Sequence, residues 1–160
     1  MDTVAPAVRR RMMQAIKSKD TGPEKTVRSI AHRAGLRFRL HVKDLPGRPD
    51  LVFPRHRTAV FVHGCFWHRH GCSRAAVPKT RPEFWAEKFA RNVARDQRQQ
   101  DELARLGWTV LVIWECETRR PCDVLAKLAT VLPVRRENLS AGTGRHRAPS
   151  VPEPCASSAP

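Results

Sequence analysis

The segment HGCFWHRHGC, residues 63–72, constrains this chain more than any other stretch of the sequence. It gathers histidines, cysteines and large aromatic residues directly behind TAVFVHG (58–64), a β-branched run that is typical of a buried strand. A segment in this position forms a loop, and the end of the preceding strand fixes the place of its reactive side chains. The sequence therefore predicts that this decapeptide is a functional loop at the edge of a sheet.

Metal binding is the first function that the loop indicates. Cys65, His70 and Cys72 follow the spacing C-x4-H-x-C. Thiolate and imidazole are the ligands that tetrahedral zinc prefers, and four of them close a structural site. Without a metal the same residues would be buried cysteines and a surface histidine, and their tight clustering disfavours that alternative.

The fourth zinc ligand has to come from another segment. Cys116 is our candidate, because it follows the apolar run WTVLVIWE (108–115), whose carboxyl end we expect beside that of TAVFVHG. Cys122 is a weaker alternative, since it begins a predicted helix six residues further on. The odd fifth cysteine, Cys155, is interpreted as an incidental thiol in a tail.

A second group of candidate residues lies around a predicted hairpin. The turn LPGRPD leads into the short strand LVF, and PRHR then turns the chain into TAVFVHG. Such a hairpin brings Asp50 next to an exposed backbone carbonyl and to the imidazole of His63. Carboxylate and carbonyl oxygens suit Mg²⁺ that bridges to a phosphate, and His68 is a candidate general base because imidazole titrates near neutrality. The alternative for Asp50 is a simple turn residue after Pro49.

The order of predicted elements indicates a single α/β domain, residues 1–133, whose mixed sheet carries helices on both faces. We expect WTVLVIWE to be the central strand, because it is the most apolar one.

Thr21 and Glu24 form a capping box at the start of the second helix, and this role accounts for Glu24 without a metal. Residues 134–160 lose periodicity and are predicted to be a disordered tail. The expected helices cover 8–18, 21–35, 82–106 and 122–132, and the expected strands 36–40, 51–53, 58–64 and 108–115.

The charge of the chain points to a polyanionic partner. The 160 residues carry a formal net charge of +15, which creates a positive potential that favours nucleic acid. An acidic membrane is the rival partner, but neither a basic amphipathic anchor nor a lipidation signal is evident. No apolar run approaches the roughly 20 residues of a membrane span, and the first residues lack the apolar core of a secretory signal, so we expect a cytoplasmic protein.

Five segments together resemble one known family. They are MMQAIKSKDTGPE, LPGRPDLVF, FVHGCFWHRHGC, TRPEFWAEKFARNVARDQR and LGWTVLVIWEC, and the resemblance runs in unbroken order over residues 9–132. This pattern is similar to the very-short-patch repair (Vsr) endonucleases. The resemblance implies a fold like that of type II restriction endonucleases with one structural zinc. It also implies a Mg²⁺-dependent enzyme that nicks double-stranded DNA 5′ to the thymine of a T:G mismatch, the lesion left by deaminated 5-methylcytosine.

The resemblance also implies a role for each matching position. Asp50 and the backbone carbonyl of Val62 would hold Mg²⁺, and His68 would be the general base, with His63 and Glu24 in support. At position 62 the family often has threonine, which is harmless if only the carbonyl binds. The zinc ligands would be Cys65, His70, Cys72 and Cys116, and the side chains inserted into DNA would be Phe66, Trp67 and Met13.

The residues themselves also suggest that Phe66 and Trp67 form an aromatic wedge, that is, side chains inserted between neighbouring base pairs. Separating two stacked base pairs costs a few kcal/mol, and the cost is lowest at a mispair. The alternative is that Phe66 and Trp67 are buried in the core.

Two other functions stay open at the level of sequence. One is a restriction-like nuclease that cuts fully paired DNA. The other is a zinc-containing DNA-binding module without catalysis, in which Asp50 is only a turn residue. A monomer is the default expectation for a nickase, and mismatch-repair proteins are implied as partners only by analogy.

Overall fold

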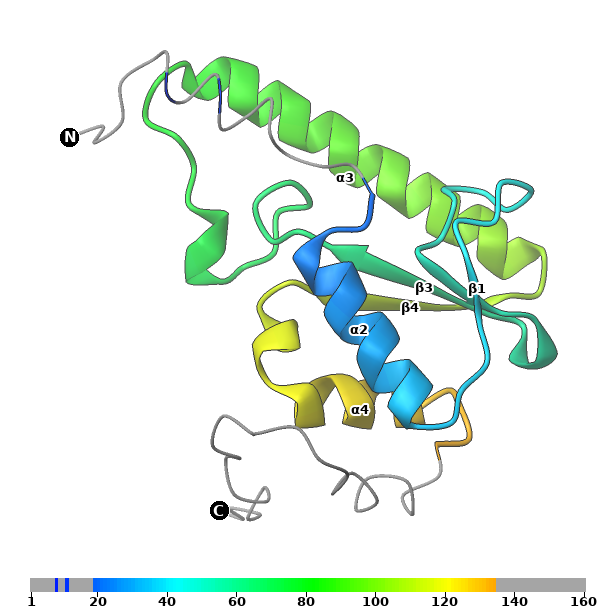
Figure 1. The fold of residues 1–160 in the computed structure, drawn as a ribbon. Coiled ribbons are helices and arrows are strands. Elements are labelled where there is room, and N and C mark those ends of the chain that lie inside the picture. Colours follow the sequence, from blue (N-terminus) through cyan, green and yellow to red (C-terminus); the bar gives the residue numbers. More distant parts are fainter. Residues whose placement is uncertain (1–7, 9–10, 12–18, 135–160) are drawn as a thin grey trace, which may run out of the picture.

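The computed structural model describes residues 8, 11 and 19–134. Within residues 19–134 the chain forms three α-helices and one four-stranded sheet, in the order α2, β1, β2, β3, α3, β4, α4 (Figure 1). The predicted mixed α/β class with helices on both faces is therefore confirmed. Met13, Cys155 and, apart from residue 134 itself, the predicted tail lie outside the described residues.

The sheet is mixed, as the sequence predicted. Its strands are β1 (Arg39–Leu40), β2 (Leu51–Phe53), β3 (Thr58–His63) and β4 (Thr109–Trp114), in the spatial order β1-β2-β3-β4. The first two pairings are antiparallel and the pairing of β3 with β4 is parallel. Parallel strands need a long crossover, and α3 (Pro82–Arg105) supplies it.

Alternating side chains divide the core into two halves. Val60 of β3 and Ile113 of β4 point to the face covered by α2 (Gly22–Arg33) and α4 (Pro121–Ala129). Ala59 and Phe61 point to the opposite face, where Leu103 of α3 covers them. Figure 1 shows α3 crossing one side of the sheet, with α2 and α4 together on the other.

The expectation that residues 108–115 form the central strand was wrong. β4 lies at the edge of the described sheet, whereas β2 and β3 each have two strand neighbours. The apolar character of β4 has another cause: Leu111 and Ile113 face α2 and α4, whereas Val110 and Val112 face the α3 side. A continuous apolar run thus reports that both faces of a strand are covered, and it says nothing about the number of strand neighbours.

The predicted strand at 36–40 is shorter than expected, with only Arg39–Leu40 paired. Leu36 belongs to the end of α2: its N–H bonds the carbonyl of Ala31, and the N–H of Gly35 bonds that of His32. With Gly35 at φ 77°, these are the two hydrogen bonds of a Schellman motif, which draws Leu36 into the core of the α2 and α4 face.

The predicted capping box begins α2 in a modified form. The Thr21 side chain accepts from the N–H of Glu24 at 3.4 Å, and its hydroxyl donates to the Glu24 carboxylate at 2.9 Å. The second Glu24 oxygen accepts from the backbone N–H of Asp20, one residue before the cap. Glu24 is thereby fixed and buried at the start of the helix.

No helix among residues 19–134 combines the length and the apolar composition that crossing a membrane requires.

Leu128 tests the core of the α2 and α4 face. Its side chain is fully buried on α4, so Leu128→Ala is expected to lower the free energy of unfolding by about 2–5 kcal/mol through lost burial and a residual cavity. Urea denaturation measures the change. Leu106→Ala is the matched control, because Leu106 is 51% exposed and its truncation should change stability by no more than about 0.5 kcal/mol. Equal costs for the two variants would contradict this assignment of the core.

Candidate functional site

A cluster of three cysteines and one histidine lies where β3 and β4 end. The parallel register pairs His63 with Trp114, so the segments that follow the two strands leave the sheet side by side. The backbone N–H of Cys116 donates to the sulfur of Cys65 at 3.4 Å, and Cys116 Sγ lies 3.4 Å from His70 Nδ1. One ligand atom from each of the four residues lies within 4.8 Å of the others: Cys65, His70, Cys72 and Cys116.

The donor set and its spacing are consistent with a zinc site. Four ligands at about 2.3 Å from a tetrahedral ion stand about 3.8 Å apart, which agrees with the observed clustering. His70 presents Nδ1 to the cluster and stacks on Trp114, with ring centroids 4.5 Å apart. Cys122, the weaker candidate, is exposed on α4 and does not belong to the cluster.

An open cleft of about 830 Å³ lies beside the carboxyl end of β3. Both Asp50 and His68 line it, as do Glu24, Val62 and His63. Groups from both faces of the sheet meet here, because Glu24 comes from α2 and the histidines lie on the α3 side. All described residues that we expected around a scissile phosphate therefore face a common space.

Asp50 and Val62 are joined at the point where the pairing of β2 with β3 ends. The N–H of Val62 donates to Asp50 Oδ2 at 2.7 Å. The β2–β3 register pairs Leu51 with Val60, and extending it by two residues places Pro49 opposite Val62. Proline has no N–H and cannot donate to the Val62 carbonyl. A backbone carbonyl and a carboxylate are thus neighbours at a point where the strand ladder ends, which is the donor set predicted for Mg²⁺.

The environment of Asp50 opposes its ionisation. The pKa of its carboxyl is raised to about 6, chiefly by burial and also by the carboxylate of Glu24, whereas the Val62 N–H and the charges of His41 and Arg28 lower it. A further positive charge bound next to Asp50 would therefore favour the ionised carboxylate.

Two stacked imidazoles and one aspartate form the α3 side of the cleft. His63 and His68 stack with ring centroids 3.9 Å apart, and His68 Nδ1 forms a short hydrogen bond with Asp96 on α3. Because a carboxylate accepts, Nδ1 carries the proton and Nε2 is left with its lone pair. Burial, and then the neighbouring His68, lower the pKa of His63 to about 4, so His63 stays neutral at pH 7 and does not repel a protonated His68.

Asp96 was not among the predicted site residues. It is buried although it is acidic. Burial acts to raise its pKa, but the hydrogen bond and the charge of His68 outweigh burial and lower it. The sequence contained a signal, since Asp96 falls on the apolar stripe of the helix that also carries Phe89 and Leu103. An ionisable residue on such a stripe needs a buried partner, and the sequence does not say which one.

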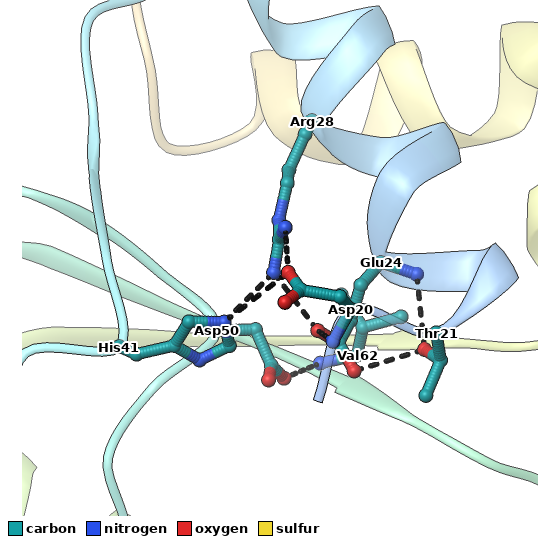
Figure 2. Close-up of polar contacts among 7 residues, drawn as sticks. All are labelled: Asp20, Thr21, Glu24, Arg28, His41, Asp50 and Val62. Carbon is teal, nitrogen blue, oxygen red and sulfur yellow. Dashed lines mark hydrogen bonds and ion pairs between the residues drawn. The ribbon is translucent and has the colours of Figure 1, made fainter. Parts of the chain in front are cut away.

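Glu24 and His41 line the opposite side of the cleft, and Arg28 connects them to Asp20. We call these four residues the α2 wall. Arg28 stands among the other three, donating to both carboxylates and lying 2.9 Å from His41 Nε2 (Figure 2). Of this wall, sequence analysis identified only Glu24.

Aromatic side chains gather between the loop that carries Cys65 and His70 and the start of α3. We call this group the aromatic cluster: Phe66, Trp67, Phe84, Trp85 and Phe89. Phe66 packs on Trp85 and Phe89, and Trp67 lies half-buried on the cleft. Lys88 Nζ stands 5.2 Å from the centre of the Trp67 ring. The proposed wedge residues are thus supported by α3, and neither is fully buried.

The cleft also has a basic rim. Lys19, Lys43, Arg48 and Arg95 line it together with the acidic and imidazole groups. Basic side chains around the cleft suit the negatively charged phosphates of nucleic acid. The carboxylates inside the cleft suit a metal ion at the phosphate that reacts.

A match to a protein family and the similarity to individual proteins both relate this chain to enzymes that cut DNA. The family DNA mismatch endonuclease Vsr matches residues 1–74. The chain is 51% identical over 131 residues to the type II nicking enzyme V.XorIIP of Xanthomonas oryzae, covering 82% of this chain and 96% of that protein. It is 49% identical over 113 residues to the DNA mismatch endonuclease Vsr of Escherichia coli, covering 71% and 72% respectively. The type II nicking enzyme V.NmeAIP of Neisseria meningitidis is 42% identical over 108 residues, covering 68% and 77%.

The cysteine cluster predicts about one zinc ion per chain, measured by elemental analysis. Cys72→Ser is expected to reduce the zinc content and to lower the thermal midpoint by roughly 10 °C or more, since binding of a structural metal contributes to folding. Cys122→Ser, which changes an exposed cysteine outside the cluster, should retain the zinc. A well-folded wild-type protein without zinc would refute this assignment.

The raised pKa of Asp50 predicts that its ionised carboxylate lowers the free energy of unfolding. Because its pKa rises from 3.8 unfolded to about 6 folded, the free energy of unfolding falls as pH rises between these values, by up to about 3 kcal/mol. Asp50→Asn removes this cost and should stabilise the protein at about pH 8, with the advantage shrinking toward about pH 4. Urea titrations without added divalent ions measure the difference.

The matched control for this prediction is Asp44→Asn, because Asp44 is exposed on the neighbouring turn. It should leave the pH profile unchanged. Stability at high pH that is no greater in Asp50→Asn than in wild type would argue against the buried carboxylate.

Proposed function

Because the chain belongs to the Vsr family of DNA mismatch endonucleases and is a DNA-nicking phosphodiester hydrolase, we propose that its substrate is duplex DNA with a T:G mismatch, cut on one strand 5′ to the mispaired thymine. The observation that carries this proposal is the common cleft of Asp50 and His68, with the aromatic cluster at its border. Very-short-patch repair of deaminated 5-methylcytosine is the process that such a cut would serve.

We propose His68 as the general base. Asp96 accepts the Nδ1 proton of His68, which directs Nε2 to the cleft and stabilises the imidazolium that forms when a proton is taken from water. His63 supports the ring of His68 by stacking and stays uncharged. Asp96 thereby orients the base and fixes its tautomer.

Asp50 and the Val62 carbonyl are our proposed ligands for the catalytic Mg²⁺. When bound, the ion would polarise the scissile phosphate and stabilise the leaving oxygen. The Val62 N–H holds one oxygen of Asp50, so the carboxylate cannot rotate away from the cleft. The proposed zinc ligands, Cys65, His70, Cys72 and Cys116, keep the loop that carries His68 attached to both strand ends.

The aromatic cluster supports recognition of a mismatch. Phe66 and Trp67 are half-buried on a platform of rings from α3, so they can enter a base stack without losing their support. Separating a base step costs a few kcal/mol and costs least at a mispair. We propose these two residues as the wedge from one groove, with Met13 acting from the other.

A nicking assay tests the proposed substrate. Otherwise identical duplexes carry T:G or T:A at one position, within flanks of random sequence, so that no context is assumed. We expect roughly 10²-fold faster nicking of the T:G duplex in the presence of Mg²⁺, since a few kcal/mol of unstacking separates the two. A sequencing gel should place the nick 5′ to the thymine.

The same assay separates the alternatives. Asp50→Asn should abolish nicking while retaining affinity for DNA, and Asp44→Asn should nick like wild type. Equal cutting of T:G and T:A duplexes would point to a restriction-like nuclease, and equal nicking by Asp50→Asn and wild type would refute the proposed metal site.

A further inference from the structure

Arg48 is a cation of the cleft to which the proposed chemistry gives no role. It lines the cleft together with Asp50, and it is an exposed residue. Within residues 19–134 its guanidinium has neither a hydrogen bond nor an ion pair. Arg95, another cation of the rim, differs in this respect, because it lies 3.3 Å from a carboxylate oxygen of Asp96. The charge of Arg48 is therefore available to an anion that enters the cleft.

A tight turn fixes the backbone that leads into Arg48. The N–H of Arg48 donates to the carbonyl of Leu45 at 3.1 Å and closes a turn that has Pro46 and Gly47 at its centre. Gly47 has φ 73°, as the third residue of a type II turn requires. A Cβ at Gly47 would stand 2.8 Å from Oε1 of Gln99, so the turn lies directly against α3; Figure 1 shows this segment in cyan. Leu45 packs on the core of the α3 face.

Arg48 itself has a strained backbone. Its φ is 51°, in the left-handed region that is unfavourable for any residue with a Cβ. The next residue, Pro49, is fully buried, so the chain is fixed on both sides of the strained position. Glycine would adopt this conformation without the cost. The backbone therefore does not explain an arginine here, and the explanation has to lie in its side chain.

The place of Arg48 in the chain relates it to the proposed point of reaction. Asp50 is two residues further on, so the two Cα atoms lie within about 7 Å of each other. The carboxylate of Asp50 is held by the N–H of Val62, whereas the guanidinium of Arg48 is not held by any described residue. Successive phosphates of one DNA strand are spaced by a distance similar to that between the two Cα atoms. A strand with its reacting phosphate at Asp50 would thus bring a neighbouring phosphate within reach of Arg48.

We propose that Arg48 is a substrate-binding residue whose guanidinium holds the phosphate next to the one that is cut, and that the strained turn fixes this charge in the cleft. The inference rests on the proposed function for the identity of the cut strand. A guanidinium suits this task because it is always charged and can donate two parallel hydrogen bonds to a phosphate. A backbone that is fixed before DNA binds also lowers the entropy lost on binding.

Replacing Arg48 by glycine separates the strain from the charge. Arg48→Gly relieves the strain, so we expect its thermal midpoint to rise by about 2–5 °C. The same variant should nick DNA roughly 10–100-fold more slowly in single-turnover assays, because a charge-assisted contact is lost. Arg55→Ala is the matched control: Arg55 is exposed in the 3₁₀ helix Pro54–His56, at the opposite end of the β2–β3 hairpin, and its loss should leave the nicking rate unchanged.

Neutral linkages in the DNA test which phosphate Arg48 holds. A methylphosphonate replaces one charged phosphate oxygen by a methyl group, and each duplex carries one such linkage beside the cut bond, which keeps its ordinary phosphate. At one flanking position wild type should lose roughly 10–100-fold in rate, whereas Arg48→Gly should lose about twofold or less. Equal losses for the two proteins at every position would overturn the proposal. So would an Arg48→Gly protein that nicks like wild type or melts at a lower temperature.

Failure of this inference is distinguishable from failure of the proposed function. The series uses whichever of the T:G and T:A duplexes wild type nicks faster, so a missing preference for the mismatch does not affect it. Binding to a paired duplex gives a readout without cutting: the slope of log K against log salt concentration should be smaller by about one in Arg48→Gly, and Arg48→Lys should retain the wild-type slope. An Arg48→Gly protein with the wild-type slope would refute the present inference, whatever DNA the enzyme cuts.

Discussion

The parallel pairing of β3 with β4 is the constraint on which the rest of this molecule depends. Its register brings His63 beside Trp114, and the segments after both strands therefore leave the sheet at one place. One segment carries Cys65 and the other Cys116, so the pairing joins residues that are 51 positions apart in the chain. Without it the cysteine cluster would lack a ligand and the loop that carries His68 would have no second attachment.

The sheet also divides the cleft that we propose as the active site into two chemical halves. The α2 wall comes from α2, the segment before it and the loop after β1, and the half-buried guanidinium of Arg28 connects its members. The imidazole half belongs to the α3 side, where Asp96 and His63 fix the ring of His68. Asp50 stands between them, directly before β2, and is hydrogen-bonded to the backbone of β3. Groups of both halves face one cleft, and hydrogen bonds hold Asp50 and His68 in position there.

Several of these groups are costly to the folded state. Burial raises the pKa of Asp50 to about 6, and Asp96 is an acid on the apolar face of a helix. The Nε–H of Arg28 is buried and has no hydrogen-bond partner within the described part of the chain. Each cost is confined to the cleft, whereas the core on both faces of the sheet is apolar and packed. Departures from ordinary burial rules are therefore concentrated where the chemistry is proposed.

The sequence by itself determined the features that depend on local patterns. Three local patterns were sufficient to predict β3, the start of α2 and most of the cysteine cluster: the β-branched run TAVFVHG, the capping pair of Thr21 and Glu24, and the spacing of Cys65, His70 and Cys72. Tertiary structure alone decided that β4 is an edge strand, that Asp96 meets His68, and that Arg28 and His41 complete the α2 wall. The physical reason is that hydrophobic periodicity reports whether a side chain is buried, whereas the identity of its partner depends on how distant segments pack.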